Sequence, residues 1–97
     1  MSCATENLVA ALRGRVPEAR LADARATPWF SATFAGARHI VTLTVAGAAD
    51  AARLLDGLDE DEIPLASGFV ADIRGDAPIA DGDRLRVRIE ALTIAED

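Results

Sequence analysis

The chain has 97 residues, a formal net charge of −6 and 51% apolar side chains, which together indicate one small globular domain. All ten basic residues are arginine, and the lack of lysine excludes a Schiff-base lysine, a Ser-Lys dyad and a lysine-dependent phosphate loop. One histidine and one cysteine cannot supply a zinc site of the His₃, Cys₄ or Cys₂His₂ type from a single chain. We therefore predict no metal site and no bound cofactor.

The charge is unevenly distributed. Residues 1–49 hold five arginines against three acids, whereas residues 50–97 hold five arginines against thirteen acids. A strongly acidic half disfavours binding to nucleic acid, because phosphate neutralisation supplies most nonspecific affinity. The sequence contains no recognisable secretion signal, no apolar run of membrane-spanning length and no partner for Cys3 in an internal disulfide. We predict a cytoplasmic protein that binds neither nucleic acid nor membranes.

The first half predicts a helix followed by a β-hairpin. Apolar residues at helical spacing favour a helix over about residues 5–13, while residues 20–26 give only a weak strand signal. From Trp29 the period changes to two, so that Phe30, Ala32 and Phe34 share one face of a strand.

A second β-branched run of the same period follows over residues 39–45. If Phe34 lies opposite His39, the apolar faces of the two strands coincide, which predicts an antiparallel hairpin in this register.

The second half repeats this order. An alanine-rich segment predicts a helix over about residues 48–56, and a strand follows from Phe69 to Arg74. Residues 75–83 are predicted as a turn-rich loop, and residues 84–94 as a long terminal strand. The alternation of this strand slips at Leu92, which indicates a bulge or a bend.

The two halves, about residues 5–46 and 48–95, therefore read as α-β-β twice within a single domain of residues 1–97. Few residues are identical, so an internal duplication and a convergent pattern both stay open. The order α-β-β-α-β-β is a cyclic shift of β-α-β-β-α-β, the ferredoxin-like plan. We predict an α+β two-layer sandwich in which two helices cover one face of a mainly antiparallel sheet of four to five strands.

His39 is the only side chain whose ordinary pKa lies near neutrality, which makes it the first candidate for a general base. No positioned acid or nucleophile accompanies it at local spacing, so a buried strand histidine is the favoured interpretation and no catalytic residue is assigned. The acidic run at residues 59–62, with Asp56 before it, lacks the spacing of a calcium loop and is interpreted as a solvated loop.

Four arginines are candidates for binding an anion or an acidic partner. Period-two spacing puts Arg84, Arg86 and Arg88 on one sheet face, and Arg74 is predicted to pair with Arg84 across the hairpin. Like charges placed opposite each other are destabilising, so this face needs an anion or acids from elsewhere. Neutralisation by nearby aspartates or by another subunit is the alternative.

Three apolar residues are predicted to point away from the helices, namely Trp29, Ile40 and Val70. They form a candidate dimer patch, unless residues 18–27 or the terminal strand fold over them. The leading functional hypothesis is a non-enzymatic, homodimeric association domain. The alternatives are a binding domain for a small anion such as phosphate or carboxylate, and, least favoured, a small enzyme that uses His39.

Overall fold

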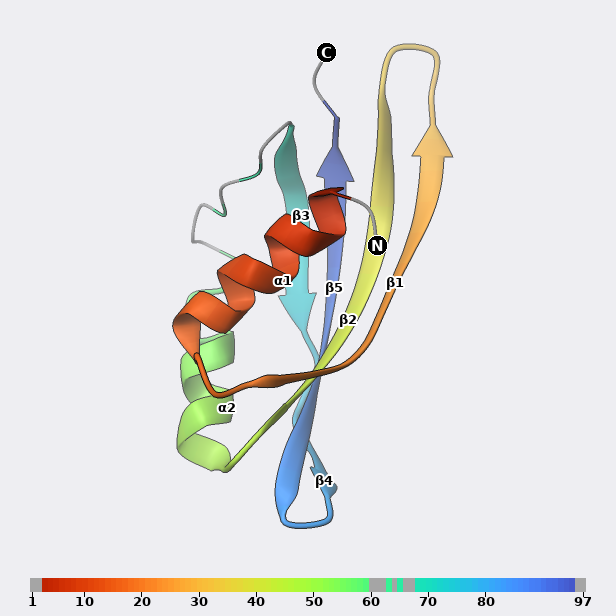
Figure 1. Ribbon diagram of the computed structural model, residues 1–97. Helices are drawn as coiled ribbons and strands as arrows, with labels where there is room; N and C mark the ends of the chain where they lie inside the picture. Colours follow the sequence, from red (N-terminus) through yellow and green to blue (C-terminus); the bar gives the residue numbers. More distant parts are fainter. Residues whose placement is uncertain (1–2, 60–62, 64, 66–67, 96–97) are drawn as a thin grey trace.

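The computed structural model describes residues 3–59, 63, 65 and 68–95, which form helices packed on one antiparallel sheet (Figure 1). The helices are α1 (Cys3–Arg15) and α2 (Ala48–Leu55). The strands are β1 (Arg20–Phe30), β2 (Ala35–Val45), β3 (Phe69–Gly75), β4 (Ile79–Asp81) and β5 (Arg84–Ile94). Both helices cover the same face of the sheet, so the predicted α+β two-layer class is confirmed. Neither helix is long and apolar enough to cross a membrane.

The strands lie in the order β1-β2-β5-β3, with β4 pairing separately with β5, and all of these pairings are antiparallel. Strands β2 and β3 flank β5 and are joined through α2, which makes a split β-α-β unit. Strands β5 and β1 flank β2 in the same way. If β5 were connected to the start of α1, then β5, α1 and β1 would form a second split β-α-β unit. The topology is therefore the cyclic shift of β-α-β-β-α-β, with the short β4 added.

The hydrophobic core lies between the helices and the sheet. From α1, Leu8 and Leu12 are fully buried, and from α2, Leu54 is fully buried. They pack with inward-facing residues of the two central strands, namely Val41, Leu43, Val45, Val87, Ile89 and Ala91. The Arg15 guanidinium donates to the Leu54 carbonyl at 3.4 Å and to the Asp56 carbonyl at 2.7 Å. It thereby caps the C-terminal end of α2, where backbone carbonyls lack helical partners.

The first hairpin differs from its predicted register. Strand β1 begins at Arg20, its last residue Phe30 pairs with Ala35, and His39 lies opposite Ala26 rather than Phe34. The reason is the turn chemistry of Ser31. Its backbone N–H donates to the Phe34 carbonyl at 2.8 Å, and its Oγ accepts from the Phe34 N–H at 3.0 Å, which closes a turn over residues 31–34.

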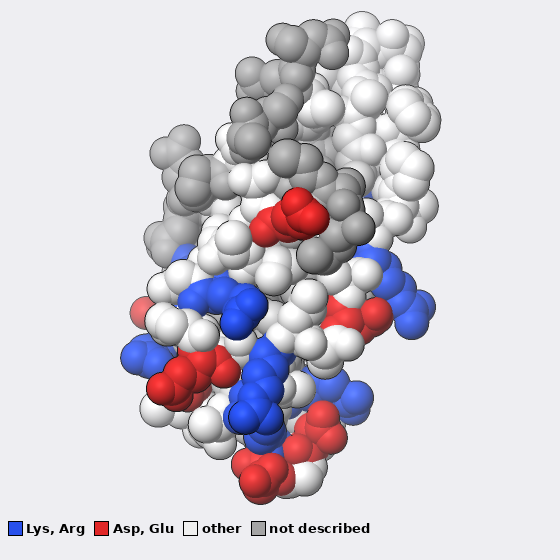
Figure 2. Space-filling model, in the orientation of Figure 1, with Lys and Arg blue, Asp and Glu red and all other residues white. Residues whose placement is uncertain are grey.

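This register also corrects the predicted burial of two aromatic residues. Phe30 and Phe34 were expected to face the core, but they are 77% and 56% exposed, respectively. They sit at the end of the β1–β2 hairpin, which extends beyond the helices (Figure 1). Charged side chains are absent from this end of the hairpin in Figure 2, and the sequence has none between Arg25 and Arg38.

The terminal strand β5 has no slip at Leu92. Its burial alternates without interruption through Ile94, and Thr93 occupies a buried position on the helix-covered face. Leu92 and Ile94 therefore point to the other face of the sheet. The register shifts lie instead in β1, between Leu21 and Asp23, and in β3, between Val70 and Asp72.

The second hairpin is also offset from its predicted register. Arg74 pairs with Glu90, not with Arg84, because residues 79–81 form β4 and occupy the place beside the start of β5. A two-residue turn joins β4 to β5, and its first residue is Gly82 with φ of 64°. Glycine adopts this left-handed conformation without steric cost, as hairpin turns of this length require.

Candidate functional site

His39 lies in the helix-covered layer and is fully buried. Its Nδ1 is 3.0 Å from the Thr5 hydroxyl of α1, and its Nε2 is 2.8 Å from the Thr93 hydroxyl of β5. The Thr93 hydroxyl donates to the Ala37 carbonyl at 3.3 Å, so it accepts from Nε2–H, and Nδ1 accepts from Thr5. Burial lowers the pKa of His39 and favours this neutral form.

These two hydrogen bonds connect α1 to β2 through Thr5 and β2 to β5 through Thr93. Both ring nitrogens are bonded to buried threonines, and no carboxylate hydrogen-bonds the imidazole within the described chain. A general base must reach a substrate proton directly or through a water. The geometry around His39 serves packing and does not provide that access.

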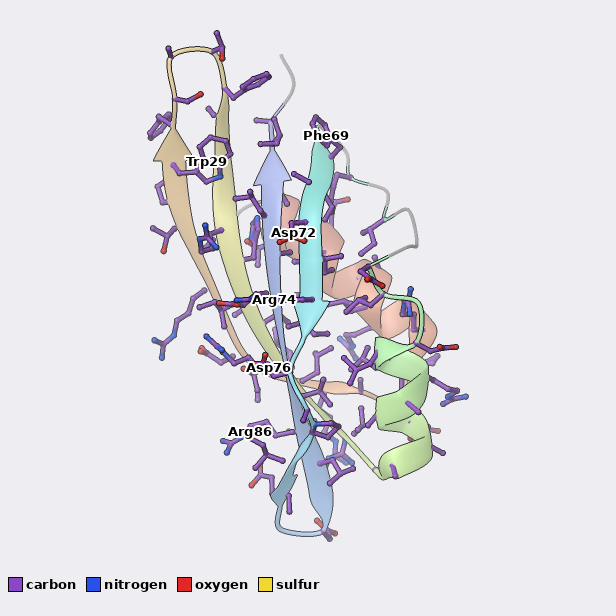
Figure 3. All side chains as sticks on the ribbon, turned by 180° about the vertical axis from the view of Figure 1, so that it is seen from behind. Trp29, Phe69, Asp72, Arg74, Asp76 and Arg86 are labelled. Atoms are coloured by element: carbon purple, nitrogen blue, oxygen red, sulfur yellow. The ribbon has the colours of Figure 1, made fainter. Side chains whose placement is uncertain are left out.

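The opposite face of the sheet carries no covering layer among the described residues, and we call it the open face (Figure 3). One half of it bears five apolar side chains, which we call the apolar patch: Trp29, Ile40, Phe69, Leu92 and Ile94. Register places Trp29, Ile94 and Phe69 in a single row across the sheet, on β1, β5 and β3. Phe69 is 46% exposed, and the other four are half-buried.

Of the three predicted patch residues, Trp29 and Ile40 lie on this face and Val70 does not. The bulge at Ala71 reverses the alternation of β3, so Val70 pairs with the inward-facing Thr93 and packs against the core. The sequence does not predict Leu92 and Ile94 as neighbours of Trp29 and Ile40, because the apolar pair at 92 and 94 indicates a bulge or a bend, whereas β5 runs without interruption. The sequence feature that could have identified Leu92 and Ile94 is that both are apolar and stand at outward positions if the strand continues without a bulge.

Trp29 lies across β2 at Gly36. A Cβ at position 36 would overlap the Thr93 carbonyl and would lie 3.1 Å from the indole Cε2, so glycine permits this close approach. The indole N–H is buried without a hydrogen-bond partner in the described part of the chain. The aromatic ring is therefore held close to the sheet and is half-buried.

The other half of the open face is charged. Arg74 donates to Glu90 at 2.6 Å, and this hydrogen bond raises the pKa of Arg74 and lowers that of Glu90. Arg88 lies 3.1 Å from Asp76 and 3.5 Å from Glu90. These four side chains form a network with no net charge.

The predicted arginines therefore share a face but have different surroundings. Arg84 donates to the Thr44 hydroxyl at 3.2 Å and to the Thr44 carbonyl at 2.9 Å. Arg86 is exposed and makes no ion pair or side-chain hydrogen bond with any described residue. The sequence placed Arg84, Arg86 and Arg88 on one face, but it missed Glu90 as the acid that neutralises Arg74.

Comparisons with protein-family models, curated proteins and solved structures give no match to this chain. Within residues 3–59, 63, 65 and 68–95 there is no cluster of three His, Cys, Asp or Glu side chains that could hold a metal ion. The side chains of the open face are therefore the basis for the function proposed below.

Proposed function

We propose that this chain is a protein-association domain that forms a homodimer through the apolar patch of its open face. The observation that supports this is the position of Trp29, Leu92 and Ile94 on a sheet face that no described residue covers as a second layer. Antiparallel sheets commonly present a polar face to water, and contiguous apolar patches on a surface mark interaction sites. Aromatic residues such as Trp29 and Phe69 are enriched at the centres of such interfaces.

The arrangement of charge around Leu92 favours a second copy of the chain as the occupant. Arg38 on β2 and Asp72 on β3 flank Leu92 on β5 in one row across the sheet. Both side chains are exposed, and neither makes a side-chain hydrogen bond or a close ion pair within the described residues, although the charge of Asp72 acts on Arg74 at longer range. A twofold axis along β5 at Leu92 brings Arg38 of each copy opposite Asp72 of the other, and Leu92 opposite Leu92.

This axis keeps the strands of the two copies roughly aligned, as in the common aligned packing of two sheets. It also brings the networks around Glu90 close together. Because Arg74, Arg88, Glu90 and Asp76 together carry no net charge, two such networks do not repel each other strongly. An isologous contact of this kind satisfies both exposed charges at once.

Sedimentation velocity over micromolar concentrations tests the proposal. The unaltered chain is expected to form dimers, and Leu92→Arg is expected to abolish them by placing two guanidinium groups at the axis. Ile79→Arg is the matched control, because Ile79 is 59% exposed on β4 and lies outside the apolar patch. Circular dichroism of both variants checks that the fold persists.

A charge-reversal cycle tests the axis itself. Arg38→Asp and Asp72→Arg should each weaken the dimer by about tenfold, because each places like charges opposite one another. The double variant should restore association. A chain that stays monomeric, or a dimer that survives Leu92→Arg, overturns the proposed interface; single reversals that the double variant does not rescue overturn the axis.

A further inference from the structure

The charged half of the open face contains a hollow of about 460 Å³. It lies where the β1 bulge, β2 and β5 meet the segment between β3 and β4. Its walls combine three apolar and five polar side chains, namely Ala22, Ala77, Ile79, Asp23, Thr42, Asp76, Arg86 and Arg88. Asp76 and Arg86 lie together in this half of the open face in Figure 3. The volume falls in the range of about 300–1,000 Å³ that is typical of small-molecule sites.

Most charges in the hollow already have partners. Asp76 is bound by Arg88 at 3.1 Å, and Asp23 is bound by Arg25 at 2.9 Å. Arg86 is the exception, since no described acid or hydrogen-bond acceptor contacts its guanidinium. The walls themselves hold two aspartates and two arginines, and with Arg25, the partner of Asp23, counted as well, the site has a surplus of one positive charge in a protein whose net charge is −6.

A second arginine strengthens this surplus. Arg20 on β1 and Arg86 on β5 both lie beside Thr44, one on each side, and Arg20 also makes no ion pair within the described chain. The Thr44 hydroxyl accepts from Arg84, so three arginines lie around this residue in the sheet, while Asp81 on β4 lies opposite Arg84. The nearest acids within the hollow are already neutralised by other arginines, which leaves an anion as the missing partner.

We propose that this hollow binds a small oxyanion, either a carboxylate or a phosphate ester, that carries an apolar group. Arg86 binds the anionic oxygens through its paired N–H donors, and the Thr42 hydroxyl adds a donor. The apolar group contacts Ala22, Ala77 and Ile79. Arg88 does not bind the anion directly, because Asp76 and Glu90 hold its guanidinium.

The site does not depend on the proposed dimer. Trp29 and Asp23 lie six positions apart on β1, or about 20 Å along the strand, although the two surfaces adjoin on β2, where Ile40 of the apolar patch is two positions from Thr42 of the hollow. Occupancy of the hollow and association through the apolar patch are measured separately, and either proposal can fail without the other.

NMR titration of the labelled protein at constant ionic strength tests the site. The probes are inorganic phosphate, phenyl phosphate, benzoate and, as the cationic counterpart, benzylamine. Phenyl phosphate or benzoate should shift the amide signals of Thr42 and Arg86 saturably, and benzylamine should not. Inorganic phosphate should bind more weakly, because it lacks the apolar group. The comparison of phenyl phosphate with benzoate identifies which oxyanion the hollow prefers.

Arg86→Gln should weaken the binding of the better probe by about tenfold or more, since it removes a charge-assisted pair of hydrogen bonds. Arg13→Gln is the matched control, because Arg13 is likewise exposed and without an ion pair but lies on α1. Equal effects of the two substitutions, equal binding of benzylamine, or no saturable shift with either aromatic anion would overturn the proposal.

Discussion

Acidification should destabilise this protein through His39. Burial lowers the pKa of the folded-state imidazole below its ordinary value of 6.5, so the unfolded chain binds the proton more readily. The stability that this group contributes is complete above pH 6.5 and is lost as the pH falls from 6.5 toward the folded-state pKa. The slope in this window is at most about 1.4 kcal/mol per pH unit.

His39→Leu isolates this effect. At about pH 7.5 the substitution removes the hydrogen bonds of 3.0 Å to Thr5 and 2.8 Å to Thr93. Each bond contributes about 0.5–1.5 kcal/mol net, so the variant should be about 1–3 kcal/mol less stable than the unaltered protein. The variant has no imidazole to protonate, and its stability should therefore fall less steeply with acidification.

Urea denaturation at about pH 7.5, 6.5 and 5.5, on either side of the ordinary histidine pKa, measures both quantities. The carboxylates titrate in both proteins, so their contributions largely cancel in the difference between the two curves. The two stabilities should converge as the pH falls. Parallel curves would refute the assignment of His39 as a neutral, buried group.

The remaining predictions concern packing and the charged network. Leu54→Ala removes a fully buried side chain of α2 and should lower the free energy of unfolding by about 2–5 kcal/mol in urea melts; a loss below about 1 kcal/mol would contradict the described core. Gly36→Ala should cost about 1–3 kcal/mol because its Cβ overlaps the Thr93 carbonyl, whereas Gly14→Ala, in a helix with nothing within 4 Å, should be neutral or stabilising by up to about 1 kcal/mol. Arg74→Ala should raise the pKa of the Glu90 carboxyl toward its ordinary value in an NMR titration, and an unchanged pKa would show that the hydrogen bond is not formed in solution.

The sequence predicted the fold class because apolar residues recur at the spacing of the elements that bury them, clearly in α2 and more weakly in α1. Leu8 and Leu12 share one face at helical spacing, and both are buried as that pattern requires. The alternation of Val41, Leu43 and Val45 identified β2 in the same way. Periodicity reports which face of an element is buried, and in these elements a single face is buried against the core.

Register was less predictable, because it depends on turns and bulges. A single extra residue at Ala22 or Ala71 moves every following side chain of the strand to the opposite face of the sheet. No local sequence feature marks either alanine as a bulge. The hydroxyl of Ser31 set the first turn, and a short β4 displaced the second hairpin. The apolar patch was therefore only partly predicted: Trp29 and Ile40 were found, and Val70 was assigned to the wrong face.

The order of the strands has a consequence for how the protein is made. The strand that pairs with β2, β3 and β4 is β5, which follows all three in the sequence. Until β5 leaves the ribosome, β2 has one unpaired edge, β3 and β4 have no partner strand, and the apolar side chains of the future core are without their central strand. These edges are open to pairing with other chains until β5 is synthesised and joins β2 to β3 in one sheet.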